Sequence, residues 1–267
     1  MTGGTWSYDG SLDGLLVLAH RAYCEGEPPD AVANALAADG ELFALLGPAP
    51  LRGAPFKGSS DQSPSELGRA AESASAELRA FSGGLFDTIL RIWMSEEALE
   101  LPLFRLCAIA GHRGTDALAD HGNPDLRAVS RASRRVGREI DRLSGLARFS
   151  PGPGGLFVAA LEPDANVIAA LLPHFARRFG SEDFALVDAR RRLALARRGG
   201  LFESATGEEA LAFLPERTGA GDEDVALWGR YFKAAENPAR RNAELQRRLM
   251  PARYWRYLPE MGGAGGA

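Results

Sequence analysis

The fold is decided by residues 137–198, which read GREIDRLSGLARFS (137–150), PGPGG (151–155) and LFVAALEPDANVIAALLPHFARRFGSEDFALVDARRRLALARR (156–198). Hydrophobic runs there alternate with turn signals and with clusters of arginine. Their order predicts the end of a helix, a strand, a turn, a second strand, a helix and a final strand or hairpin. Short loops join antiparallel neighbours, and no regular alternation of strands and helices is visible. We therefore predict an α+β fold, with an antiparallel sheet packed against and wrapped by helices.

The flanking segments extend this prediction to the whole chain. Residues 6–24 predict a short strand, a turn and a helix, and the strand is expected to join the main sheet. A helical segment is expected at 30–46, and Asn123-Pro124 predicts the start of a long helix. The predicted organisation is a single α+β domain over residues 1–261. It has a helical insertion at about 25–130, a sheet core at about 137–198, a helical C-terminal segment at 222–260 and a disordered tail at 262–267.

The charges are unevenly distributed along the chain. Residues 1–130 hold 9 Lys and Arg against 18 Asp and Glu, a net charge of −9, whereas residues 131–267 hold 22 against 17, a net charge of +5. Such a separation indicates either a surface that binds a polyanion or two halves that attract each other. No apolar run is long enough to span a membrane, and the N-terminus lacks the pattern of a signal peptide.

The motifs of several enzyme classes are missing. The sequence has no glycine-rich phosphate loop, no HExxH, no paired CxxC, no nucleophile elbow and no three-cysteine radical-generating motif. The two cysteines, Cys24 and Cys107, fall in apolar helical patterns, and the histidines are scattered. We therefore expect no metal site, no cofactor and a reduced, cytoplasmic location.

Polar side chains gather at the turns of the predicted sheet: Glu139, Asp141, Arg142, Arg148, His174, Asp188, Arg190 and Arg191. A carboxylate beside several arginines stays ionised, which suits a structural salt-bridge network as well as a catalytic site. We interpret the group as a network. The catalytic alternative rests on Glu139, Asp141, His174 and Asp188.

The basic half suggests nucleic-acid binding. Arginines would contact phosphate, and aromatic side chains near the C-terminus would stack on unpaired bases. The alternative is that these aromatics pack the last helices onto the core. The candidate contacts are Arg134, Arg138, Arg142, Arg148, Arg190, Arg191, Arg240 and Arg241, with Tyr254 and Trp255 for stacking.

Five segments together resemble one bacterial family: YDGSLDGLL (8–16), GREIDRLSGLARF (137–149), LEPDANVIAALLPHFARRF (161–179), FALVDARRR (184–192) and ENPARRNAELQRRLMPARYWRYLPE (236–260). It is the family of DNA metabolism or DNA repair proteins built on a domain of unknown function of the DUF4130 type. Its members are typically encoded beside a DNA-repair radical SAM protein, and a similar domain is fused to uracil-DNA glycosylase-like proteins. The resemblance implies a role in DNA repair by association rather than through a recognised site.

One departure from the family pattern concerns the junction before the sheet. The family has Glu-x-His-Arg there, whereas this chain has Glu139-Ile140-Asp141-Arg142. Asp141 would have to replace a histidine base with a very different pKa. The leading hypothesis is therefore an accessory protein that binds single-stranded or damaged DNA, the radical SAM partner, or both. The alternatives are an enzyme acting on a nucleotide or DNA lesion, and a protein-binding subunit without affinity for DNA.

Overall fold

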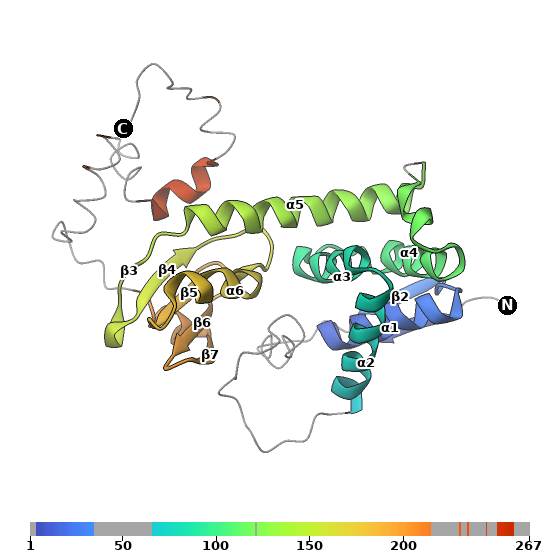
Figure 1. The fold of residues 1–267 in the computed structure, drawn as a ribbon, viewed down its shortest axis with the longest axis horizontal. Coiled ribbons are helices and arrows are strands. Elements are labelled where there is room, and N and C mark those ends of the chain that lie inside the picture. Colours follow the sequence, from blue (N-terminus) through green and yellow to red (C-terminus); the bar gives the residue numbers. More distant parts are fainter. Residues whose placement is uncertain are drawn as a thin grey trace. The chain divides into compact units, whose positions relative to one another are not determined.

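The computed structural model describes residues 4–34, 66–120, 122–214 and 250–258, with the single helical positions 230, 234 and 244. Two compact units make up the chain (Figure 1). Of the described residues, unit 1 holds 4–34, 66–120, 122–138 and 164–167, and unit 2 holds 139–163, 168–214, 250–258 and the single positions 230, 234 and 244.

Unit 1 is mainly helical. Its two short strands, β1 (Thr5–Tyr8) and β2 (Ala31–Asn34), pair in parallel. Its helices are α1 (Leu12–Glu25), α2 (Glu66–Phe81), α3 (Gly83–Ser95), α4 (Glu100–Arg113), η1 (Thr115–Ala119) and the N-terminal part of α5 (Pro124–Leu146).

Helix α1 packs against α2 and α4 in the core of unit 1. Ser11 caps it by accepting a bond from the Gly14 amide over 2.8 Å. Its buried stripe holds Leu12, Leu15, Leu16, Ala19 and Ala22, which repeat every three to four residues. Helix α4 approaches α1 closely at Gly111, where any β-carbon would lie 2.0 Å from the carbonyl oxygen of Tyr23. Glycine is therefore required at this crossing.

Unit 2 is built on a five-stranded sheet of order β3-β4-β5-β6-β7. Only β4 and β5 run parallel, and α6 connects them; the other neighbouring pairs are antiparallel. The elements are β3 (Ser150–Pro151), η2 (Pro153–Gly155), β4 (Phe157–Leu161), α6 (Ile168–Phe179), β5 (Phe184–Asp188), β6 (Leu193–Arg198), β7 (Leu201–Thr206), α7 (Gly207–Leu211) and η4 (Ala252–Tyr257).

Both faces of the central strand are covered, and β5 is buried at every position. On one face, α6 packs against β5 and β6 (Figure 1), and the rings of Phe149, Phe175, Phe179 and Phe184 contact one another with centroids 4.6 to 6.2 Å apart. On the other face lies a core of Leu156, Val158, Ala185, Val187, Ala194, Ala196 and Ala210. Successive residues of a strand point to opposite faces, so β5 contributes to both layers.

The predicted α+β class is confirmed, as is the antiparallel character of most of the sheet. Two details of the prediction are wrong. The N-terminal strand does not join the main sheet but pairs with β2, which lies inside the predicted helix at 30–46. The strands β4 and β5 are parallel because a helical crossover lies between them, and such a connection returns the chain to the same end of the sheet.

Most of the predicted C-terminal helical segment at 222–260 and the tail at 262–267 lie outside the described residues. Among the helices that the structure does describe, none has both the length and the apolar character needed to cross a membrane.

Candidate functional site

A buried hydrogen bond joins α5 to η4 within unit 2. The hydroxyl of Tyr254 donates to Oε1 of Glu139 over 2.6 Å, and the two residues are only 2% and 3% exposed. Arg253 donates from Nη2 to the same hydroxyl over 2.9 Å, and this nitrogen lies 3.6 Å from the Glu139 carboxylate. The Arg253 guanidinium also lies 4.7 Å from the centre of the Tyr254 ring. We call these three residues the Glu139 cluster.

The electrostatics of the Glu139 cluster keep Tyr254 protonated. Burial and the hydrogen bond to Glu139 raise the pKa of Tyr254 to about 12, and Arg253 opposes the rise. At neutral pH the phenol is therefore a neutral donor, and the carboxylate of Glu139 is its acceptor. A bond of this kind to a charged group stabilises the fold more than a bond between neutral groups does.

Asp188 organises the turn that follows β5. Its Oδ1 accepts bonds from the backbone amides of Arg190 and Arg191, each over 3.0 Å. Its Oδ2 accepts a bond from Nη1 of Arg191 over 2.9 Å, and Nη1 also donates to the carbonyl oxygen of Pro163 over 3.0 Å. Burial raises the pKa of Asp188, and the bonds from Arg191 partly offset the rise. Both carboxylate oxygens are thus used in holding the β5–β6 turn and the end of β4.

Helix η4 connects the Glu139 cluster to the same end of the sheet. Arg256 forms an ion pair with Glu162, which directly follows β4. Burial raises the pKa of Tyr257. The charge of Arg256 lowers this pKa, and the charge of Asp188 raises it. The polar groups therefore gather where the parallel strands β4 and β5 end, which is the edge at which open α/β sheets commonly bind ligands.

The bonding pattern favours a structural network over a catalytic pair. Glu139 and Asp188 are buried and already accept bonds from neighbouring donors. A general base has to reach a proton on its substrate, and neither carboxylate is exposed to do so in this arrangement. The two other predicted catalytic residues lie apart from this network. Asp141 is exposed on α5. It lies two positions from Glu139 and therefore on a different side of the helix. The half-buried His174 packs edge-on against Phe175.

An exposed basic stripe runs along α5 in unit 1. Arg131, Arg134 and Arg138 are all exposed and follow the i, i+3, i+7 spacing of one helix face. None of the three forms an ion pair with another residue in the part of the chain that the structure describes. Their neighbour Arg135, by contrast, is paired with Glu97. We call Arg131, Arg134 and Arg138 the α5 stripe.

Comparison with known proteins identifies a family but no characterised relative. Residues 97–260 match the family model for the domain of unknown function DUF4130, which is more than half of the chain. The chain belongs to the DUF4130 family. No curated protein and no solved structure matches it. The matched segment of this DUF4130 protein includes the whole of α5, the Glu139 cluster and Asp188.

The remaining predicted nucleic-acid contacts have varied surroundings. Arg142 and Arg148 are half-buried, and Nη1 of Arg148 donates to the carbonyl oxygen of Gly145 over 2.9 Å. Arg190 is exposed, whereas Arg191 is engaged with Asp188. The predicted stacking residues belong to η4: Tyr254 is buried in the Glu139 cluster, and the half-buried Trp255 donates from Nε1 to the carbonyl oxygen of Met250 over 2.9 Å. Arg240 and Arg241 lie outside the described residues.

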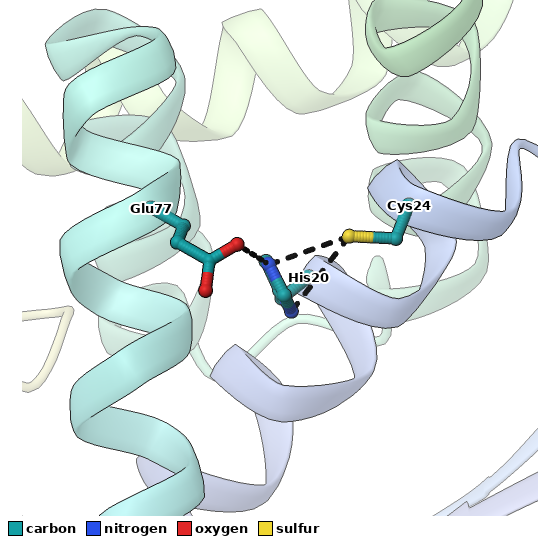
Figure 2. A group of neighbouring side chains, drawn as sticks. All are labelled: His20, Cys24 and Glu77. Carbon is teal, nitrogen blue, oxygen red and sulfur yellow. Dashed lines mark hydrogen bonds and ion pairs between the residues drawn. The ribbon is translucent and has the colours of Figure 1, made fainter.

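One group of reactive side chains in this DUF4130 protein is not predicted from the sequence. His20 and Cys24, in α1, lie beside Glu77, in α2, on the surface of unit 1 (Figure 2). The spacing of His20 and Cys24 is one helical turn, i and i+4, which places both side chains on the same face. That spacing could have been recognised from the sequence, although its partner on the second helix could not.

Proposed function

We propose that this DUF4130 protein is a DNA-binding accessory protein of a DNA repair or modification system. The observation that carries the proposal is the α5 stripe, where three exposed arginines follow one helix face without an acidic partner among the described residues. The family resemblance supplies the link to DNA repair, and the stripe supplies a surface that suits phosphate.

The charge of the α5 stripe suits a polyanion. At 1.5 Å per residue, Arg131 and Arg138 lie about 10 Å apart along the helix axis, so the stripe could follow several phosphates of a strand. Guanidinium groups bind phosphate oxygens in a bidentate manner. The charges of the three arginines are available for such contacts because none of them is paired with a carboxylate among the described residues. Such contacts orient a nucleic acid but read no sequence. The proposed ligand is therefore single-stranded or damaged DNA bound through its backbone.

The experiment is a fluorescence-anisotropy titration of the full chain with single-stranded, duplex and uracil-containing DNA over a series of salt concentrations. The test variant is Arg134→Gln with Arg138→Gln. Each phosphate contact contributes roughly 0.7 to the slope of log affinity against log salt for a single strand, so the double variant should bind more weakly and its slope should fall by about 1.4.

The control is Arg177→Gln with Arg178→Gln, which removes the same charge from two exposed positions on α6. This control should keep most of the slope of the original chain. Equal losses in the two double variants would show that binding depends on net charge and not on the stripe. If the original chain does not bind DNA even at low salt, the proposal is wrong, and a pull-down with the neighbouring radical SAM protein tests the protein-binding alternative.

An enzyme acting on a nucleotide or DNA lesion is the second candidate. What favours it is the place of Asp188 at the end of β5, beside the end of the parallel strand β4. Helix η4, which contacts Glu139 through Tyr254, also reaches Glu162 directly after β4. This candidate would require the Glu139 cluster to open, because the carboxylate is buried and bonded. Glu139→Gln keeps an acceptor for Tyr254 but removes the base. Loss of a lesion-processing activity in that variant, with an unchanged fold, would support this candidate.

A further inference from the structure

Three potential metal ligands converge between α1 and α2 in unit 1 (Figure 2). Nε2 of His20 lies 2.9 Å from Oε2 of Glu77 and 3.4 Å from Sγ of Cys24. The three ligand atoms all lie within 4.8 Å of one another. These residues precede the segment that matches the DUF4130 family, so the family match does not account for them.

The arrangement differs from that of a cysteine nucleophile. In a catalytic triad, the thiol and the carboxylate contact opposite nitrogens of the imidazole ring, so that the ring passes a proton between them. Here Glu77 and Cys24 both approach Nε2, whereas Nδ1 lies 4.0 Å from the sulfur. The thiol and the carboxylate oxygen instead lie beside the same ring nitrogen.

We propose that His20, Cys24 and Glu77 form a binding site for a zinc-like divalent cation on the surface of unit 1. Imidazole, thiolate and carboxylate are the three side-chain ligand types of zinc sites. With metal–ligand distances of about 2.0 to 2.3 Å and tetrahedral angles, the ligand atoms would be separated by about 3.3 to 3.6 Å. The observed 3.4 Å between nitrogen and sulfur already fits, and the 2.9 Å between nitrogen and oxygen has to open by about half an ångström.

The packing of the two helices holds these ligands near one another. The rings of Tyr23 and Phe81, which belong to α1 and α2, lie 4.7 Å apart. Buried small and apolar residues flank the ligands on each helix: Ala19, Ala22, Ala74 and Leu78. The hydroxyl of Ser73 donates to Oε1 of Glu77 over 3.2 Å, which leaves Oε2 directed at His20. Outer contacts of this kind orient ligands and strengthen metal binding.

The exposure of the group predicts an open coordination position. Cys24 and Glu77 are exposed and His20 is partly exposed, so water can reach a metal held by the three residues. Three protein ligands with a fourth position for water are the pattern of catalytic or exchangeable zinc sites, whereas structural sites use four protein ligands. The proposed site would therefore bind and release its ion rather than be required for folding.

The experiment uses the full chain, stripped with a chelator under reducing conditions and titrated with Co²⁺, followed by competition with Zn²⁺. Cobalt bound to a thiolate in tetrahedral geometry gives charge-transfer and intense visible absorption bands, so the spectrum reports the ligands directly. We expect saturation at one Co²⁺ per chain and displacement by Zn²⁺. Cys24→Ser should abolish the charge-transfer band, and Glu77→Gln should weaken binding by more than about tenfold, since even changes in outer contacts can cost that much.

The control is Cys107→Ala, which removes the other cysteine, a buried residue of α4 that is not among the three proposed ligands. It should leave the band and the stoichiometry unchanged. The proposal is overturned if no thiolate band develops at saturating Co²⁺, or if the band persists in Cys24→Ser. Because the three ligands lie on the surface, their substitution leaves the core of unit 1 intact, and circular dichroism verifies this for each variant.

Discussion

The bond between Tyr254 and Glu139 provides a sharp test of how unit 2 is held together. Replacing Tyr254 with phenylalanine keeps the ring in place but removes the hydroxyl that donates to the buried carboxylate. Glu139 would then retain Arg253, whose Nη2 lies 3.6 Å away and which is itself about half exposed. We expect η4 to lose stability relative to α5, while the rest of the fold stays as it is.

The size of the effect follows from the burial of Glu139. Removing one partner and leaving a buried polar group without it costs about 1 to 3 kcal/mol, and more when that group is charged. We take about 2 kcal/mol, which is about a 30-fold increase in the population of the open state. The assay is native-state hydrogen exchange of the amides of Tyr254 and Leu258, which donate to Pro251 and Trp255 within η4. Their exchange should accelerate by about 30-fold in Tyr254→Phe.

Tyr23→Phe in α1 is the matched control, since it makes the same chemical change in unit 1. Exchange in η4 should be unaffected by it. If η4 exchanges at the original rate in Tyr254→Phe as well, the bond to Glu139 does not hold this segment, and the reasoning about the Glu139 cluster fails.

Two further predictions concern unit 2. The pKa of Tyr254 is raised to about 12 from an ordinary value of 10.0. The protonated phenol therefore contributes its full share to the free energy of unfolding below about pH 10, and this contribution is lost as the pH rises through about 12. Thermal unfolding midpoints measured from pH 9 to 12 should therefore fall less steeply in Tyr254→Phe than in the original chain; parallel curves would contradict this. Asp188→Asn keeps an acceptor for the backbone amides of the β5–β6 turn but removes the charge partner of Arg191. The free energy of unfolding of unit 2, measured with urea, should therefore fall by about 2 kcal/mol. The control Asp141→Asn, at an exposed position, should change that free energy by less than about 0.5 kcal/mol. Equal effects of the two variants would show that the bonds of Asp188 carry no particular weight.

Local chemistry explains the parts of the fold that the sequence predicts well. Asn123 accepts bonds from the amides of Asp125 and Leu126, and α5 begins at Pro124 as predicted. Gly180 adopts a positive φ of 60° directly after α6. The run at 184–188 forms β5, and its predicted hairpin partner forms β6. Each of these features depends on a few neighbouring residues, so the sequence itself contains the information.

Long-range pairing is where prediction fails. The partner of β1 depends on contacts between segments more than twenty residues apart, and its sequence does not distinguish β2 from the main sheet. The pairing of β4 with β5 also depends on where α6 packs, since the helix decides which end of the sheet the chain returns to. Strand β7 was not predicted because its alternating polar residues are typical of an edge and contain few apolar positions.

In the candidate sites, too, local features can be predicted from the sequence and long-range contacts cannot. Glu139 and Asp188 are recognisable from the sequence as carboxylates beside arginines, and the exposed positions of Arg134 and Arg138 follow from the helical period. The partner of Glu139 could not be predicted, because Tyr254 lies 115 residues further along the chain. Glu77 is likewise hidden from any local pattern, since it reaches His20 from a different helix.

That separation of 115 residues has a consequence for how the protein is made. The N-terminal part of a chain leaves the ribosome first, so α5 and the five strands of the sheet in unit 2 emerge before Tyr254 does. Strands β5, β6 and β7 can pair early because short turns join them, and closing a short loop costs little conformational entropy. The side chain of Glu139 has to remain hydrated until η4 arrives. Unit 2 therefore completes its packing only after η4 has emerged, and a nascent chain stalled before residue 254 displays a carboxylate that is buried in the folded protein.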